Sequence, residues 1–276
     1  MRTMGTLYLI ATPIGNLEDL SPRAVRMLGE VDLIAAEDTR HTRKLLSHFE
    51  IQTPLTSYFE HNKLSKLDGI LDVLRHGDVA LVSDGGMPVI SDPGYELLCS
   101  AIDNGHDVLP VPGQSAVLSA LAVSGLPTDA FVFLGSLPRK SVERCRKLAE
   151  NASDGLTLVA FESPHRLSAA LRDIEAEWGD RRLAVARELT KVHEEIFRGT
   201  VSAARAYFAN EPVRGEVTLV IAGRADVVQR KWEAARVSDS LRDSLEAGES
   251  RSKAAKEIAR RSGWPRRDVY QLDLPD

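Results

Sequence analysis

Three short segments of this chain combine carboxylates with arginine, lysine or histidine directly after an apolar run. They span residues 36–44, 162–166 and 186–194. Carboxylates can accept protons, and cations can stabilise developing negative charge or bind an anionic group, so these residue types suit chemistry on a charged substrate. Ion pairing between a loop and the next helix explains a single cluster of this kind. Three clusters favour a shared site.

Four loops rich in Gly and Pro accompany these clusters, at residues 12–16, 83–88, 91–94 and 112–116. Such loops let the backbone approach a ligand closely at the carboxyl ends of strands. The 113–117 segment resembles a nucleophile elbow, but Val117 stands where a hydrolase needs glycine. We therefore interpret it as a ligand-binding turn in which Ser115 offers a hydroxyl and an N–H at a helix start. The Ser-Asp-Pro at 91–93 also reads as a helix-start signal.

Several common site types lack their motifs here. Neither G-x-G-x-x-G nor G-x-x-x-x-G-K-[ST] occurs, which argues against the usual nucleotide-binding loops. The seven histidines are scattered, and Cys99 and Cys145 have no metal spacing around them, so we expect no metal. Two distant cysteines fit reduced thiols in a cytoplasmic protein.

The elements that must position these residues alternate between strand and helix up to residue 223, which predicts an α/β fold. Strands are predicted at 6–11, 32–36, 79–83, 108–111, 131–134, 156–161, 183–187, 194–198 and 217–222. A Gly-Pro turn at 124–129 separates two α/β domains, predicted at 1–124 and 125–226. No apolar run approaches the ~20 residues of a membrane helix, so no membrane association is expected.

The last fifty residues differ, because strand signals vanish and basic residues accumulate. Between residues 250 and 267 seven basic residues face only Glu257. That stretch carries a net +6, so the rest of the chain, at a total of −5, carries −11. Its helix–glycine–helix pattern predicts a helix-turn-helix-like unit at 227–276 that binds nucleic acid. The alternative is a solvated helix face.

Several segments, in this order, resemble the tetrapyrrole methylase superfamily, and within it the branch that methylates a ribose 2′-hydroxyl of 16S rRNA. They are LIATPIGNL (9–17), DLIAAEDTRHT (32–42), LVSDGG (81–86), ISDPG (90–94), FESPHR (161–166) and ARELTK (186–191). The resemblance implies two α/β domains of tetrapyrrole-methylase type with S-adenosyl-L-methionine (SAM) in the interdomain cleft, and a homodimer. The family usually reads S-D-A-G-T-P where this chain has Gly85 and Met87, and Gln114 also departs from its pattern.

By resemblance, nine residues are expected to bind SAM: Pro13, Asp84, Gly85, Met87, Ser115, Ala116, Phe161, Leu189 and Thr218. The implied reaction is methyl transfer to the 2′-hydroxyl of a decoding-region cytidine of 16S rRNA in the 30S subunit. Candidate catalytic residues are the proton acceptors Glu37, Asp38 and Glu188 and their electrostatic partners Arg40, Arg166 and Lys191. Candidate RNA contacts are Arg43, Lys44, His165, Arg251, Lys253, Arg266 and Arg267.

Two other functions stay open at this point. One is C-methylation of a corrin or porphyrin precursor, whose polyacidic substrate would also suit basic clusters. The other is a nucleic-acid-binding regulator that uses SAM only as an effector. A helix-turn-helix-like unit argues against the first of these, since a free small substrate needs no such module.

Overall fold

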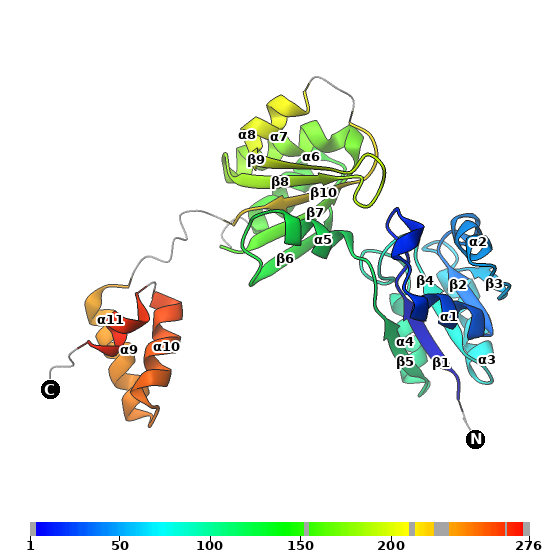
Figure 1. The fold of residues 1–276 in the computed structure, drawn as a ribbon, viewed down its shortest axis with the longest axis horizontal. Coiled ribbons are helices and arrows are strands. Elements are labelled where there is room, and N and C mark those ends of the chain that lie inside the picture. Colours follow the sequence, from blue (N-terminus) through cyan, green and yellow to red (C-terminus); the bar gives the residue numbers. More distant parts are fainter. Residues whose placement is uncertain (1–3, 152–154, 210–212, 224–231, 263, 273–276) are drawn as a thin grey trace.

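The computed structural model describes residues 4–151, 155–209, 213–223, 232–262 and 264–272. Figure 1 shows two layered units, each built on a sheet, and a third group of helices beyond the second sheet. The mixed α/β fold expected from the sequence is confirmed. None of the described helices is long and apolar enough to cross a membrane.

The first sheet is entirely parallel and has the order β3-β2-β4-β1-β5. Its strands are β1 (Thr6–Ile10), β2 (Leu33–Ala36), β3 (Leu55–Ser57), β4 (Val79–Val82) and β5 (Asp107–Val111). All four residues of the central β4 are buried, as expected for a strand covered on both faces. The carboxyl ends of the five strands therefore meet at one edge.

Helices cover both faces of this sheet. They are α1 (Pro22–Glu30), α2 (Thr39–His48), α3 (Lys63–Leu74) and α4 (Tyr95–Asp103). The apolar residues of α1 and α2 join one cluster with Ile10 and Ile34, whereas those of α3 and α4 join another with Leu7 and Leu81. Side-chain caps begin two of the helices: Ser21 accepts a hydrogen bond from the Ala24 amide, and Asp38 accepts one from the Arg40 amide.

The second sheet is mixed and has the order β6-β7-β10-β8-β9. Its strands are β6 (Phe131–Ser136), β7 (Thr157–Glu162), β8 (Arg182–Arg187), β9 (Glu195–Thr200) and β10 (Val217–Ile221). Only β6 and β7 pair in parallel, and their carboxyl ends lie at the same edge. The nine predicted strands are all present. The short edge strand β3 is an addition to them.

Four helices pack on this second sheet. They are α5 (Ala116–Val123) on one face, and α6 (Ser141–Glu150), α7 (Leu167–Trp178) and α8 (Val201–Tyr207) on the other. By packing, α5 belongs with the second sheet, although the predicted boundary at 124/125 places it with the first. The chain crosses between the sheets just before α5.

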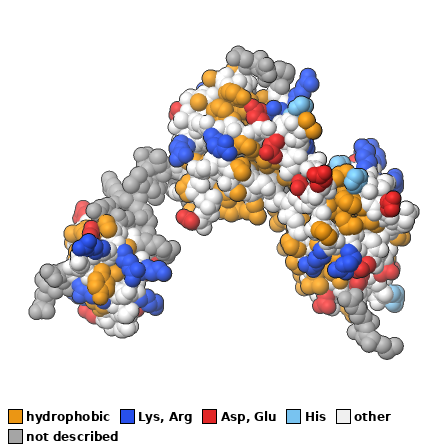
Figure 2. Space-filling model, viewed as in Figure 1, with side chains coloured by type: hydrophobic (Ala, Val, Ile, Leu, Met, Phe, Trp, Pro, Cys, Tyr) orange, Lys and Arg blue, Asp and Glu red, His pale blue; other side chains and the backbone are white. Residues whose placement is uncertain are grey.

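The C-terminal helices form a separate small core. They are α9 (Ala234–Glu246), α10 (Arg251–Ser262) and α11 (Arg266–Tyr270). Val237, Leu241, Ile258 and Val269 are buried together, and the Trp264 indole donates to the Trp232 carbonyl at 2.7 Å. Lys and Arg side chains gather on the face of this group that Figure 2 presents. The predicted boundary at 226/227 lies outside the described residues.

One buried ion pair anchors α6 to α7. Arg144 is 2% exposed, and its side chain meets the Asp173 carboxylate at 2.5 and 2.7 Å. Removing one partner of a buried pair leaves the other charge desolvated. We therefore expect Arg144→Met to lower the free energy of unfolding by about 3 kcal/mol, measured by urea denaturation. The exposed Arg26–Glu30 pair is the control, because Arg26→Met should cost less than about 1 kcal/mol. Equal losses in the two variants would contradict this account.

Candidate functional site

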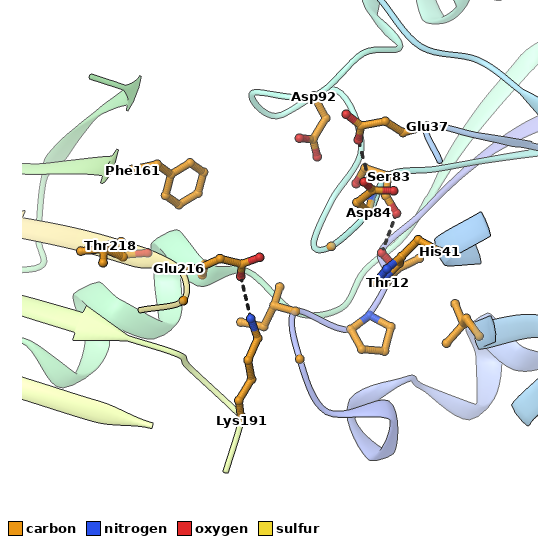
Figure 3. A pocket seen from close by; sticks show the side chains of 18 of the residues that line it. Thr12, Glu37, His41, Ser83, Asp84, Asp92, Phe161, Lys191, Glu216 and Thr218 are labelled. Atoms are coloured by element: carbon orange, nitrogen blue, oxygen red, sulfur yellow. Dashed lines mark hydrogen bonds and ion pairs between the residues drawn. The ribbon is translucent and has the colours of Figure 1, made fainter. Parts of the chain in front are cut away.

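A cavity of about 790 Å³ lies where the carboxyl-end loops of the two sheets face each other (Figure 3). This volume falls in the range of about 300–1,000 Å³ that small-molecule sites occupy. The first sheet's side contributes Thr12, Pro13, Ile14, Gly15, Leu17, Glu37, His41, Thr42, Lys44, Leu45, Ser83, Asp84, Gly85 and Asp92. The second contributes Ala116, Phe161, Glu162, Ser163, Pro164, Lys191, Gly215, Glu216, Val217 and Thr218.

The loops after β1 and β4 are fastened to each other beside the cavity. The backbones of Thr12 and Gly86 exchange two hydrogen bonds of 2.9 Å, and the Thr12 hydroxyl donates to the Ser83 carbonyl at 3.0 Å. Gly86 has a φ of +90°, a backbone conformation that residues other than glycine rarely adopt. This bridge fixes the backbone around Pro13, Asp84 and Gly85 along one wall.

Three carboxylates converge on that wall. Glu37, Asp84 and Asp92 lie close together in Figure 3, and the Asp84 amide donates to Glu37 Oε2 at 3.4 Å. Burial raises the pKa of Glu37, and the charges of Asp92, Asp84 and Asp38 raise it further against the opposing hydrogen bond from the Asp84 amide. Burial likewise raises the pKa of Asp92. Glu37 is therefore a stronger base than an ordinary glutamate.

Lys191 lies on the opposite wall between two glutamates. Its Nζ is 2.9 Å from Glu188 Oε1 and 3.2 Å from Glu216 Oε2. Burial alone would lower the pKa of Lys191, but the hydrogen bonds and charges of these glutamates outweigh it and raise the pKa. A Cβ added at Gly15 would stand 2.5 Å from Lys191 Cγ, so the β1 loop touches the second sheet's side here.

Backbone strain is concentrated in the two loops that flank the cavity. Val89 and Ser91 have φ of 75° and 67°, and Glu188 and Thr190 have φ of 51° and 67°. Left-handed backbone is costly for non-glycine residues, above all β-branched ones, and such strain gathers at functional sites. Each loop thus holds an unusual conformation next to a charged group of the cavity.

Six of the nine predicted SAM contacts line this cavity: Pro13, Asp84, Gly85, Ala116, Phe161 and Thr218. Met87, Ser115 and Leu189 are outside the lining. The Ser115 hydroxyl instead accepts a hydrogen bond from the Leu118 amide at 3.4 Å and caps α5. Leu189 packs into the apolar cluster between α5 and the second sheet. Gly85 has no left-handed φ, but the Cβ of the alanine usual in the family would stand only 3.3 Å from the Pro13 carbonyl oxygen.

The predicted catalytic residues separate in the structure. Glu37 and Lys191 line the cavity, whereas Asp38, Arg40, Arg166 and Glu188 do not. Asp38 and Arg40 pair with each other at 2.7 Å, and this hydrogen-bonded pair lowers the pKa of Asp38, so its carboxylate is a weak base. Arg166 pairs at 2.7 Å with the buried carboxylate of Glu162.

The predicted RNA contacts also fall into different places. Lys44 lines the cavity, while Arg43 and His165 are exposed near its edge. In the C-terminal helices Arg251 donates to the carbonyls of Tyr270 and Leu272, so its guanidinium holds the unit together. Lys253, Arg266 and Arg267 are exposed. Eight polar lining residues are absent from the predicted site residues: Thr12, His41, Thr42, Ser83, Asp92, Glu162, Ser163 and Glu216. Asp92 belongs to the 91–94 loop, which the sequence predicts to lie at a ligand, but its side chain is not among the predicted site residues.

The charge of the lining is strongly unbalanced. Five carboxylates, those of Glu37, Asp84, Asp92, Glu162 and Glu216, face two lysines, Lys44 and Lys191. Such a cavity attracts a cationic ligand and repels a polyanionic one. Among the described residues no cluster of His, Cys, Asp and Glu is arranged to hold a metal ion.

Known proteins resemble this chain in sequence and in fold. Proteins named "Ribosomal RNA small subunit methyltransferase I" are similar to the chain: one from Synechocystis sp. is 48% identical over 98% of both chains, and one from Halalkalibacterium halodurans is 46% identical over 97% of this chain and 94% of its own. A relative of the same name from Thermotoga maritima is 49% identical over 80% of this chain and 100% of its own length.

Solved structures share the fold at low identity. A diphthine synthase superposes with a TM-score of 0.62 at 13% identity, covering 79% of this chain and 89% of that one. A cobalt precorrin-4 methyltransferase superposes with a TM-score of 0.59 at 19% identity, covering 79% and 94%. The family model described as "Tetrapyrrole (Corrin/Porphyrin) Methylases" matches residues 6–205. The chain therefore belongs to the tetrapyrrole methylase family.

Proposed function

We propose that this chain is a SAM-dependent methyltransferase that acts on the ribose 2′-hydroxyl of a decoding-region cytidine in 16S rRNA. The name of its relatives, at 46–48% identity over nearly the whole chain, supports an rRNA substrate. The raised-pKa carboxylate of Glu37 inside an acidic cavity is the observation that supports the chemistry. A ribose hydroxyl is a poor nucleophile and needs a base of this kind.

The cavity's residues fit SAM. Its net negative lining complements the positive charges of a sulfonium and an ammonium group. A Cβ at Gly85 would stand 3.3 Å from the Pro13 carbonyl oxygen, so glycine lets the loops after β1 and β4 pack closely together beside the cavity. Phe161 and Ile14 supply apolar surface, and Thr218 and Asp84 supply hydrogen-bonding groups. When bound, SAM supplies an electrophilic methyl group.

The chain's own residues then have distinct tasks. Glu37 accepts the proton of the 2′-hydroxyl as the oxygen becomes nucleophilic. Asp84 and the backbone held by the Thr12–Gly86 bridge orient the donor, since alignment of the two reacting atoms supplies much of the rate. Lys191, fixed by Glu188 and Glu216, offers a positive charge on the acceptor side.

The acidic lining also bears on the two alternatives. A corrin or porphyrin precursor carries several carboxylates, which five lining carboxylates would repel. A regulator that only senses SAM has no need of a half-buried base. We further propose the 30S subunit as substrate, a homodimer as the working form and a cytoplasmic location. Three domains at 1–124, 125–226 and 227–276 stay a proposal, in which α5 at the end of the first segment packs on the sheet of the second.

Transfer of radiolabelled methyl from SAM to 30S subunits that lack the modification tests this function. Label recovered in a ribose-methylated cytidine supports it. Label recovered in a macrocyclic precursor, or in no acceptor, contradicts it.

Asp84 offers a test of the donor site alone. We expect Asp84→Ala to weaken SAM binding by about 1–3 kcal/mol, because alanine lacks the carboxylate that would accept hydrogen bonds from the ligand. Isothermal titration calorimetry measures the change. Asp103→Ala, at the exposed end of α4 and outside the cavity lining, is the control and should bind SAM normally. Unchanged affinity in Asp84→Ala removes this residue from the site.

A further inference from the structure

The loop at residues 137–140, which follows β6, carries two cations that the site described above does not use. Arg139 and Lys140 are both exposed. Arg139 makes no ion pair with any residue that the structure describes. Lys140, with an 80% exposed side chain, lies 3.3 Å from Glu143, and an exposed pair of this kind is weak. Both charges are thus available to a partner.

This loop begins at the wall of the cavity. The Leu137 amide donates to the carbonyl of Phe161, a lining residue, at 3.0 Å. Gly135, with a φ of +64°, lies against the loop that carries Asp92: a Cβ there would stand 3.2 Å from Ser91 Oγ. The end of β6 therefore lies between Phe161 and the loop that carries Asp92, and Arg139 and Lys140 follow two and three residues after Leu137 in the chain.

The backbone of the loop is held from inside the fold. Arg144, which is almost fully buried, donates to the carbonyls of Pro138 and Arg139 at 3.0 and 3.3 Å. Its remaining donors meet Asp173. A loop fixed in this way presents its side chains with little backbone entropy left to lose on binding.

The charges of the cavity and of this loop are opposite. The carboxylates of the lining repel phosphate, so an RNA strand can bring a ribose to Glu37 only if the neighbouring phosphates stay outside. Cations on a loop that leaves the cavity wall can bind those phosphates, since lysine and arginine are among the groups that contact the phosphate oxygens of nucleic acids. We propose that the loop at residues 137–140 is a docking site for the RNA phosphate backbone, in which Arg139 and Lys140 bind phosphates beside the target ribose. This inference rests on the function proposed above.

The test compares double variants of the full chain. Arg139→Ala/Lys140→Ala should bind 30S subunits about 10-fold more weakly in near-physiological salt, and the slope of log affinity against log salt should fall by about 1–2. SAM affinity by calorimetry should not change, and the effect on turnover should be in KM more than in kcat. Arg139→Lys/Lys140→Arg should restore binding.

Arg26→Ala/Arg75→Ala is the matched control, because it removes two exposed cations that lie outside the cavity lining. It should bind 30S subunits like the wild type. If the wild type binds and methylates 30S subunits and the Arg139/Lys140 double variant matches the control, the docking site is wrong and the proposed function stands. If the wild type neither binds nor methylates them, both fail.

Discussion

Replacing Glu37 with glutamine is expected to lower kcat for methylation of 30S subunits by about 10²–10⁴-fold, the usual contribution of a general base. The amide keeps the size of the side chain but cannot accept the proton. SAM affinity should change little, since the effect is on the acceptor hydroxyl. Single-turnover methyl transfer at saturating SAM measures the loss.

The pH dependence gives a second readout for Glu37. Only the carboxylate form is a base, so the rate should fall as pH drops through the raised pKa, above the ordinary 4.5. In Asp92→Asn this acid limb should move to lower pH, because the charge of Asp92 raises the pKa of Glu37.

A raised carboxyl pKa also means that the free energy of unfolding falls as pH rises through that pKa, so Glu37→Gln should melt no lower than the wild type at pH 7. A full rate in Glu37→Gln would exclude the general-base role.

Removing the chain beyond Asp226 is expected to weaken binding to 30S subunits by about 10²–10³-fold, because the seven basic residues between 250 and 267 are lost. The salt dependence of the remaining binding should be shallower for the same reason. SAM binding should persist, since α9–α11 have their own apolar core and contribute nothing to the cavity lining. The Thermotoga maritima relative, matched in full by 222 residues of this chain, is shorter by a similar length.

A charge-only variant separates phosphate binding from the mere presence of these helices. Lys253→Gln/Arg266→Gln/Arg267→Gln keeps the helical core and spares Arg251, whose guanidinium caps carbonyls of the unit. It should lose much of the affinity that truncation removes. The competing outcome is that truncation yields monomers in sedimentation while the salt dependence stays the same. In that case the helices complete a dimer and do not dock RNA.

The fold was largely predictable because the strands after which the loops occur are apolar, β-branched and regularly spaced. Strand β3 was not predictable, because only Leu55 of its three residues is apolar and all three are half-buried. The packing of α5 was also beyond the sequence: its apolar residues require a sheet, but nothing in their pattern says which of the two sheets it covers. The crossing of the chain before α5 decides that.

The site was predictable to the level of loops and less so to the level of side chains. Strand ends indicate which loops meet, and the family resemblance points to Pro13, Asp84 and Phe161, which line the cavity. The Asp92 side chain was missed because its orientation depends on left-handed backbone at Val89 and Ser91. A valine and a serine give no sequence signal for that conformation. Ser115 was assigned to the ligand, but its hydroxyl caps α5.

If the 30S subunit is the substrate, as proposed above, the separation of charge along the chain would determine which part of the protein meets it first. With +6 on residues 250–267, which contain α10 and the start of α11, and −11 on the remainder, the molecule is an electric dipole. The field of a polyanion orients such a dipole before contact. Encounters should therefore begin at the C-terminal helices, because the acidic α/β sheets are repelled. The C-terminal helices would then hold the protein on the RNA. The cavity could reach only a ribose that lies within the distance allowed by the chain between these helices and the second sheet.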